Sequence, residues 1–203
     1  MTIHILFPQP VYSSKLERAL TKEELKIINK QQKKTRKNDG NTTSKDNYVL
    51  ENKTLKNLKE DLNKRVFEYF NKIICTNSPI IPYITQSWIN YTKTNQFHHR
   101  HSHSNSHVSG VFYIAADKKV DSITFYRAKA DETINLNVAK YNLFNSTSWK
   151  FPVQTGDVFL FRSSLEHGVV RTKGTNTRIS LSFNTFIKGK IGKHASLTEL
   201  VLK

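Results

Sequence analysis

The spacing of apolar residues changes near Pro79, and this change constrains the fold more than any other feature of the chain. Between Thr54 and Ile74, apolar residues recur every three or four positions, which places them on one face of a helix. After Pro79 the chain breaks into short segments rich in β-branched and aromatic residues: YITQSWINY, HVSGVFYIAA, SITFYRA, GDVFLFRSS and RISLSFNTFI. The pattern predicts a mainly β protein, with flanking helices packed on an antiparallel sandwich or barrel.

The length of 203 residues suits a single domain. We expect residues 1–75 to form a helical N-terminal support and residues 79–187 to form the β core. Residues 188–203 should be a C-terminal tail. No internal repeat of fixed period is visible, which argues against a solenoid or a propeller.

A helix is expected to begin at Thr21, because Glu24 follows three residues later in the pattern of a capping box. Its basic end runs into the polar, turn-rich stretch NDGNTTSKDN. This composition predicts a flexible basic loop over about 33–53, which is a candidate lid or docking arm. Solvated lysines that complement the helix dipole are the simpler interpretation of the basic residues.

The charge balance and the single cysteine limit the setting of the protein. The chain carries 32 Lys and Arg against 16 Asp and Glu, a formal net charge of +16. Such a surface attracts nucleic acid or acidic proteins, although a generally basic, soluble surface explains it equally well. Cys75 is the only cysteine, so an internal disulfide and a zinc site of several thiolates are excluded. We expect a cytoplasmic protein with neither a membrane span nor a signal peptide.

Five of the eight histidines lie between Phe97 and Ile114, in the segment FHHRHSHSNSHVSGVFYI. Histidine is the commonest metal ligand, and its neutral form can donate a lone pair at neutral pH. Since His99, His101 and His103 are two residues apart, their side chains project to the same side of an extended chain. His167 follows a predicted strand far downstream and could complete a metal site in space.

Polar residues also alternate along TRISLSFNTF, where Arg178 and Ser180 share one face of a predicted strand. Alternation alone favours a half-exposed strand whose polar face meets water. Arg178 comes 11 residues after His167, since 178 − 167 = 11, so one turn could return the guanidinium beside His167 on an adjacent strand. There it could bind a carboxylate through two hydrogen bonds, with the Ser180 hydroxyl offering another.

Four segments together resemble the family of 2-oxoglutarate- and Fe(II)-dependent oxygenases found in phages and marine bacteria. They are LFPQPVY, SWIN, HSHSNSHVSGVFYI, and the run from Gly156 through LFRSSLEHGV to RISLSFN. The resemblance implies a double-stranded β-helix, the jelly roll shared with cupins. It also implies an iron site that uses 2-oxoglutarate and O2 as cosubstrates, in the host cytoplasm if the chain is viral.

The same resemblance assigns roles to individual residues. His101 matches the first metal ligand, His167 matches the distal one, and His103 stands where many related oxygenases have Asp or Glu. Arg178 and Ser180 match the pair that binds the far carboxylate of 2-oxoglutarate. The resemblance also puts the SWINY strand near the cavity, where Asn90 could orient the cosubstrate, while Trp88 on the same face is expected to pack in the sheet.

The histidine cluster departs from the wider superfamily because it contains no carboxylate. His103 is therefore either a third neutral ligand or a neighbour of an iron held by His101 and His167. Asp117, the nearest downstream acid, is expected in a turn and not at the metal. The remaining histidines His98, His99 and His107 should lie beside the site or face solvent.

The predicted activity is the hydroxylation of a protein side chain, coupled to conversion of 2-oxoglutarate to succinate and CO2. A nucleic-acid substrate for the same chemistry is the main alternative. A non-catalytic β-helix protein that holds a metal belongs to a different functional class and stays open because the carboxylate is missing. A cupin-like enzyme that uses another metal without 2-oxoglutarate is a further possibility.

Overall fold

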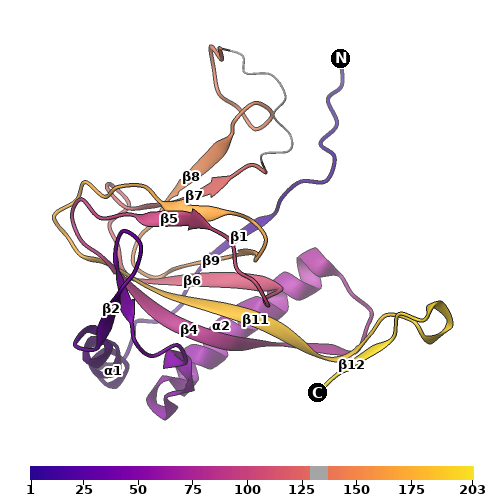
Figure 1. Cartoon of the computed structure of the whole chain (residues 1–203), viewed down its shortest axis with the longest axis horizontal. Helices are drawn as coiled ribbons and strands as arrows, with labels where there is room; N and C mark the ends of the chain where they lie inside the picture. The colour runs from indigo at the N-terminus through magenta and orange to yellow at the C-terminus, as the bar shows by residue number, and fades with distance from the viewer. Residues whose placement is uncertain (129–136) are drawn as a thin grey trace.

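The computed structural model describes residues 1–128 and 137–203, which form two facing β-sheets (Figure 1). The large sheet has the strand order β1-β9-β6-β11-β4-β3-β2, with β12 paired to β11. Its strands are β1 (Val11–Lys15), β2 (Thr35–Lys37), β3 (Thr42–Ser44), β4 (Ile80–Thr92), β6 (Val108–Ala115), β9 (Asp157–Arg162), β11 (Arg178–Ile191) and β12 (Leu200–Leu202). The small sheet has the order β5-β10-β7-β8, from β5 (His98–His101), β7 (Ser122–Tyr126), β8 (Ser148–Pro152) and β10 (His167–Val169). The prediction of a mainly β fold is confirmed.

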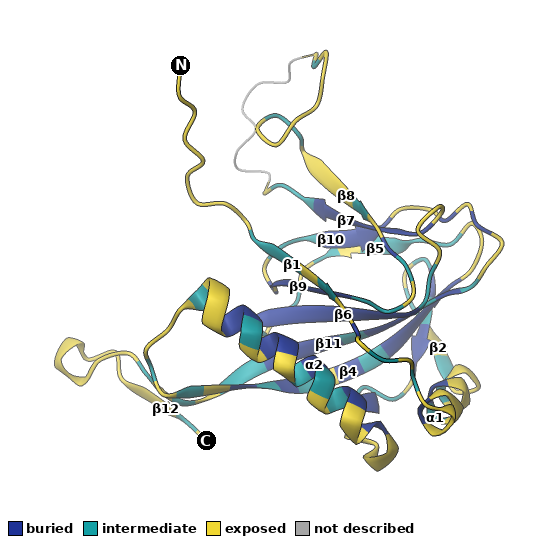
Figure 2. Ribbon diagram, turned by 180° about the vertical axis from the view of Figure 1, so that it is seen from behind, coloured by how far each residue is buried: buried dark blue, intermediate teal, exposed yellow. Residues whose placement is uncertain are grey.

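Two main helices flank the large sheet. α1 (Lys22–Gln32) begins at the predicted capping box, where the Glu24 amide donates to Thr21 Oγ1 at 3.1 Å and the Thr21 amide donates to Glu24 Oε2 at 2.8 Å. α2 (Lys56–Tyr69) continues into a π-helical turn, η3 (Phe70–Ile74), and lies across the outer face of the large sheet (Figure 2). The short 3₁₀ turns are η1 (Val49–Glu51), η2 (Lys53–Leu55) and η5 (His194–Ser196). No helix within the described ranges is long and apolar enough to cross a membrane.

β6 explains why one segment of the sequence reads as a continuous apolar run. The strand is buried on both faces, so it has no reason to alternate polar and apolar residues. Val111 and Tyr113 belong to the core between the two sheets, whereas Phe112 and Ile114 belong to the core that includes the buried residues of α2. The strand is thus the shared wall of two hydrophobic cores.

The segment expected to be a flexible basic loop, about 33–53, instead contains the β2–β3 hairpin and η1. Polar side chains make the contacts that join it to the sheet: Thr43 Oγ1 donates to the Ile89 carbonyl at 3.1 Å, and the Ile89 amide donates to Ser44 Oγ at 3.1 Å. Thr43 and Ser44 are both buried. Because the segment is polar, its composition did not indicate that it forms an ordered hairpin.

Two other boundaries differ from the expectation. The N-terminal residues 1–75 are not purely helical, because β1 pairs with β9 at the edge of the large sheet. The expected tail at 188–203 contains the end of β11 and its partner β12, paired from Gly189 opposite Leu202 to Ile191 opposite Leu200. Polar, exposed residues in β1 and at the end of β11 weaken the apolar alternation by which a strand is detected, and β12 is only three residues long.

Candidate metal and carboxylate site

The cavity between the sheets brings together three histidines that the sequence separates. His101 ends β5 and stands opposite His167, the first residue of β10, in the antiparallel pairing of the small sheet. His103 follows β5, and its amide donates to the Ser163 carbonyl at 2.9 Å. One nitrogen from each imidazole lies within 4.8 Å of the others. The predicted convergence of these three side chains is therefore present.

Backbone carbonyls orient two of these rings. Nδ1 of His101 lies 2.8 Å from the His99 carbonyl oxygen, and Nδ1 of His167 lies 3.0 Å from the Leu165 carbonyl oxygen. Because a carbonyl only accepts, each Nδ1 must carry the hydrogen. In the neutral ring this leaves the Nε2 lone pair free, the arrangement typical of a histidine that binds a metal.

The surroundings of the three imidazoles favour their neutral form. Burial, together with the smaller effect of the charge of neighbouring His101, lowers the pKa of His103 to about 4 and that of His167 to about 3. Burial also lowers the pKa of His101. At neutral pH a metal would therefore not have to displace protons from these rings.

Arg178 is a buried cation without an acidic partner. Its side chain is only 3% exposed, and Nη2 donates to the Tyr113 hydroxyl at 3.2 Å. Its Nε has no partner, and among residues 1–128 and 137–203 no carboxylate pairs with the guanidinium. A buried charge of this kind is costly unless it is compensated, so this position calls for an anionic ligand.

From the sequence, Arg178 was predicted to lie on a strand adjacent to that of His167, and this prediction is wrong. β10 lies in the small sheet and β11 in the large one, so the two residues line the same cavity from different sheets. Ser180, two residues along β11, also lines the cavity and is buried. The polar face of the strand therefore meets an internal cavity and not bulk water.

β4 contributes Asn90 and Trp88. Asn90 stands opposite Ser180 and donates from Nδ2 to Ser182 Oγ at 3.0 Å, while its buried Oδ1 has no partner in the described chain. Trp88 was expected to pack in the sheet, but it lines the cavity with its ring centroid 5.6 Å from that of His103. The free space is about 30 Å³, room for one or two water molecules, so a larger ligand requires side chains at this wall to move.

No carboxylate lines the cavity in the part of the chain that the structure describes. Asp117 lies in a turn, as expected, where Oδ1 accepts from the Lys119 amide at 2.9 Å. His107 is exposed and its ring lies 5.4 Å from that of Phe70, away from the other histidines. Among the described residues, Asp39 Oδ2 lies 3.7 Å from His99 Nδ1 but does not line the cavity, so the group of His101, His103 and His167 has no carboxylate beside it in this part of the fold.

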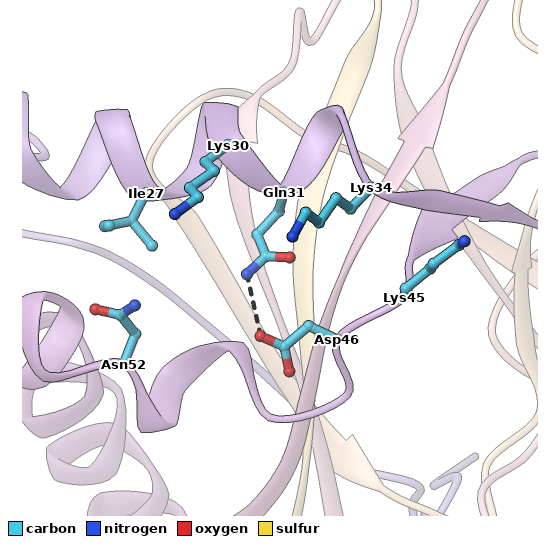
Figure 3. A pocket seen from close by; sticks show the side chains of 7 residues that line it. All are labelled: Ile27, Lys30, Gln31, Lys34, Lys45, Asp46 and Asn52. Atoms are coloured by element: carbon cyan, nitrogen blue, oxygen red, sulfur yellow. Dashed lines mark hydrogen bonds between the residues drawn. The ribbon is translucent and has the colours of Figure 1, made fainter.

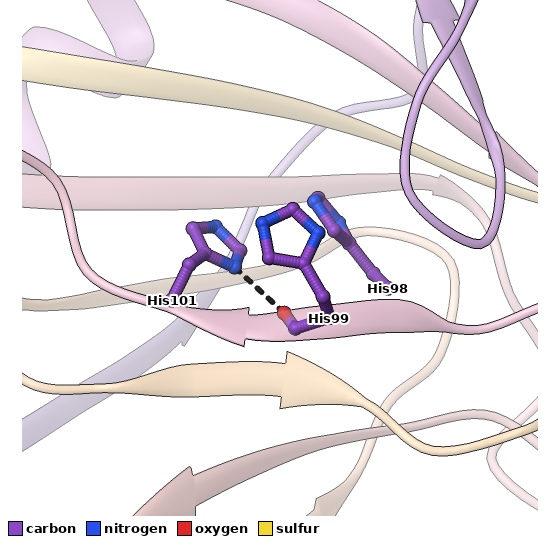
Figure 4. Close-up of side chains that lie close together, drawn as sticks. All are labelled: His98, His99 and His101. Carbon is purple, nitrogen blue, oxygen red and sulfur yellow. Dashed lines mark hydrogen bonds between the residues drawn. The ribbon is translucent and has the colours of Figure 1, made fainter.

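Sequence reasoning missed Tyr113 as a cavity residue, and it left open whether His98 lies beside the site or faces solvent; both residues line the cavity. Tyr113 could have been found, because it shares the strand parity of Val111 within a buried strand. His98 carries no such signal. It forms a second group with His99 and His101 in which ligand nitrogens lie within 4.8 Å (Figure 4), and burial lowers the pKa of His98 to about 2.

Comparison with known proteins identifies the architecture. Residues 86–184 match the family model described as "Putative 2OG-Fe(II) oxygenase". A 2OG-Fe(II) oxygenase family oxidoreductase from Burkholderia pseudomallei is similar at 15% identity and TM-score 0.56, over 85% of this chain and 83% of that one. HygX from Streptomyces hygroscopicus, solved with nickel, 2-oxoglutarate and hygromycin B, is similar at 12% identity and TM-score 0.58, over 87% and 82%. No curated protein matches. The fold is the double-stranded β-helix, as the resemblance implied.

Proposed function

Residues 86–184 match the family model "Putative 2OG-Fe(II) oxygenase", and from this match we propose that the chain is a member of that family and hydroxylates a protein side chain in the cavity described above. The family uses Fe(II), 2-oxoglutarate and O2. His101, His103 and His167 would hold the iron. Arg178, Ser180 and Asn90 would hold the cosubstrate.

One observation carries this assignment: an unpaired, buried guanidinium shares a cavity with three neutral imidazoles. The imidazoles offer lone pairs to a divalent metal, and Arg178 offers a planar set of donors to a carboxylate. A dicarboxylate that carries a metal-binding group at one end satisfies both. 2-Oxoglutarate has this chemistry, so the residues fit the cofactor and the cosubstrate of the family.

The chain's own residues divide the work of binding. Arg178 would neutralise the distal carboxylate, with the Ser180 hydroxyl as a second donor on the same face of β11. Asn90 would orient the ligand or a bound water through its unpartnered Oδ1. The cavity also has an apolar wall, formed by Val111, Ile123 and Phe161, which limits the access of water to the site. When bound, the metal would activate O2 as the oxidant while 2-oxoglutarate supplies two electrons and becomes succinate and CO2, so that one oxygen atom of O2 ends in succinate and the other in the hydroxylated substrate.

His103 is proposed as the third ligand. Its ring centroid lies 4.9 Å from that of His101 and 5.1 Å from that of His167. Three neutral ligands leave the charge of Fe(II) uncompensated by the protein. The carboxylate at the metal-binding end of 2-oxoglutarate would then provide part of the balancing charge, while the other carboxylate pairs with Arg178, so metal and cosubstrate should strengthen each other's binding.

A basic cleft supports an acidic protein as the substrate. It has a volume of about 400 Å³ and lies between α1 and the segment 45–52 (Figure 3). Lys30, Lys34 and Lys45 line it, and within the described segments none of them makes an ion pair. Its carboxylate, Asp46, already accepts from Gln31 Nε2 at 3.0 Å and from the Tyr48 amide at 2.8 Å.

The side chains of this cleft suit carboxylates better than nucleobases. Its lining residues are Ile27, Lys30, Gln31, Lys34, Lys45, Asp46 and Asn52, without an aromatic ring on which a base could stack. The β2–β3 hairpin connects the cleft to the cavity. A strand advances about 3.3 Å per residue, so the four steps from Lys34 to Asn38 span roughly 13 Å. An acidic segment held in the cleft could therefore extend along the hairpin to Asn38, which contacts the cavity residue His98.

Mass spectrometry of host proteins and RNA, treated with the active protein or with Arg178→Ala, tests the proposal. A gain of one oxygen on a protein is expected only with the active protein. Lys34→Glu with Lys45→Glu should reduce that product, whereas the same charge change at exposed Lys118 and Lys119 should not. Oxygen on RNA would favour the nucleic-acid alternative. If the protein binds the metal but forms no succinate with any candidate substrate, the alternative of a non-catalytic metal-binding protein would be favoured.

The location in a reducing cytoplasm remains part of this proposal. It is supported by the single Cys75, which is exposed and unpaired in the structure. Metal-dependent activity that survives Arg178→Ala unchanged would instead indicate the cupin-like alternative, because such an enzyme does not need a carboxylate partner for this guanidinium. A complete dependence on Arg178 would exclude it.

A further inference from the structure

The tip of the β2–β3 hairpin packs against the start of β5. The Phe97 amide donates to the Gly40 carbonyl at 3.1 Å, and the Asn38 amide donates to the Asn41 carbonyl at 2.9 Å. Gly40 has φ +86°, and a Cβ atom at this position would lie 2.6 Å from the Phe97 oxygen. The tip therefore needs glycine, and its close approach places residues 38–41 directly beside the histidine cluster.

A chain of polar contacts runs from this tip to His98. Asn38 Nδ2 lies 3.2 Å from His98 Nε2 and also donates to Asn41 Oδ1 at 3.0 Å. Asn41 Nδ2 in turn donates to Thr92 Oγ1 at 3.3 Å. An amide nitrogen only donates, so in this orientation of the Asn38 amide His98 Nε2 is the acceptor and the hydrogen of the neutral ring is on Nδ1.

This tautomer argues against a second metal site at His98, His99 and His101. His98 Nε2 accepts from Asn38, and His98 Nδ1 carries hydrogen, so neither nitrogen has a free lone pair. His101 Nδ1 is bonded to the His99 carbonyl, and its remaining nitrogen is needed by the group with His103 and His167. His98 is better suited to donate a hydrogen bond than to bind a metal.

His98 also lies where it could donate a hydrogen bond to a ligand in the cavity. Its ring stacks on that of His101 with a centroid distance of 4.6 Å and an interplanar angle of 24°. It lines the same cavity as Arg178, and its Nδ1 has no hydrogen-bond partner in the described residues. A ligand that reaches from the histidines toward Arg178 would therefore share the cavity with this ring.

We propose that His98 is a positioning residue that donates its Nδ1 hydrogen to an oxygen of 2-oxoglutarate, and that Asn38 at the hairpin tip holds the required tautomer. This inference rests on the proposed function of the cavity. It gives the hairpin a role in cosubstrate binding, and it makes the distance between β2–β3 and β5 a determinant of affinity for 2-oxoglutarate.

The test combines anaerobic binding titrations with ¹⁵N NMR of the imidazoles in the full chain. His98→Leu should weaken 2-oxoglutarate binding to the Fe(II)-loaded protein by about tenfold or more, the effect of losing a hydrogen bond to a charged group. Fe(II) binding without 2-oxoglutarate should change less than about twofold. His107→Leu, at an exposed histidine outside the cavity, is the matched control.

Asn38→Ala provides a second, milder variant. The NMR spectrum of the unaltered protein should show His98 with hydrogen on Nδ1, whereas Asn38→Ala should populate the other tautomer and weaken 2-oxoglutarate binding severalfold. Unchanged affinity in both variants would overturn the inference, and loss of Fe(II) binding in His98→Leu would make His98 a metal ligand instead. If the unaltered protein binds Fe(II) but no 2-oxoglutarate, the proposed function itself fails.

Discussion

His101 and His167 stand directly opposite each other on β5 and β10, with ring centroids 4.5 Å apart, although 66 positions separate them (167 − 101 = 66). A metal bound between them would connect two strands of the small sheet. Since such a metal binds the folded chain and not the unfolded one, it stabilises the fold by an amount that grows with the logarithm of its free concentration above Kd.

Removing either ligand should abolish this stabilisation. Saturating Fe(II), kept anaerobic, should raise the midpoint of thermal unfolding of the unaltered protein by several degrees. His101→Ala and His167→Ala should show no such rise, while His107→Ala should behave like the unaltered protein because His107 lies away from the site. Differential scanning fluorimetry measures the shift, and an equal shift in His167→Ala would rule out the assigned ligands.

Arg178 should matter for 2-oxoglutarate and not for iron. Arg178→Lys keeps the charge but loses the planar pair of donors, so affinity for 2-oxoglutarate should fall by about tenfold or more. Arg178→Met should lose affinity for 2-oxoglutarate almost entirely. Without ligands, Arg178→Met should not lower the free energy of unfolding and should raise it by ~1 kcal/mol, because an uncompensated buried charge is removed. Calorimetry and chemical denaturation check the two effects.

Acid should destabilise the metal-free protein through its buried imidazoles. The unfolded chain protonates histidine near pH 6.5, whereas folded His103 and His167 do so only near pH values of about 4 and about 3. Between these values the unfolded state binds more protons, so the free energy of unfolding falls as pH falls below about 6.5. The slope is at most ~1.4 kcal/mol per pH unit for each imidazole.

The control for this dependence is His103→Asn, which removes one of the two titrating rings. Urea unfolding between pH 7 and pH 4 should give a shallower slope for this variant than for the unaltered protein. Equal slopes would mean that His103 is not held in its neutral form by the fold.

A carboxylate at position 103 should change how metal and cosubstrate depend on each other. His103→Asp supplies the anionic ligand that the cluster lacks, so Fe(II) should bind more tightly in the absence of 2-oxoglutarate. The strengthening of Fe(II) binding by 2-oxoglutarate should become smaller, because the protein then provides part of the balancing charge. Titration of Fe(II) with and without 2-oxoglutarate measures both quantities. If His103→Asp leaves both unchanged, His103 is a neighbour of the iron and not a ligand.

Trp88 should report cosubstrate binding. The free space of the cavity is about 30 Å³, too small for 2-oxoglutarate, and Trp88 forms part of its wall beside His103. Binding should therefore move Trp88 and change its fluorescence. The change should vanish in Trp88→Phe and persist in Trp149→Phe, since Trp149 lies 42% exposed on β8. A signal that depends on Trp149 instead would place the movement elsewhere.

The sequence predicted the parts of the site that follow from local pattern. The capping box at Thr21, the strands around Val111 and Phe159, and the convergence of His101 with His103 all rest on neighbouring residues. The sequence predicted that Arg178 lies near the histidines, but it placed Arg178 on a strand adjacent to His167. The 11 positions that separate them allow either a hairpin within one sheet or a connection between two sheets. Local spacing does not distinguish these connections.

The β2–β3 hairpin was missed, and the place of His98 was left open, for a different reason. Thr43 and Ser44 join the sheet through side-chain hydrogen bonds, which leave no apolar signature in the sequence. His98 lines the cavity and its neighbour His99 does not, and His98 contacts Asn38, a residue 60 positions away. Such long-range polar contacts are visible only once the fold is known.

The central claim is that a single cavity holds iron on His101, His103 and His167 and holds 2-oxoglutarate on Arg178. Anaerobic visible absorption tests it most directly, because 2-oxoglutarate bound to Fe(II) gives a weak charge-transfer band. The band should appear when both are added to the unaltered protein, weaken in Arg178→Ala and be absent in His167→Ala. No band in the unaltered protein, or an undiminished band in His167→Ala, would contradict the claim.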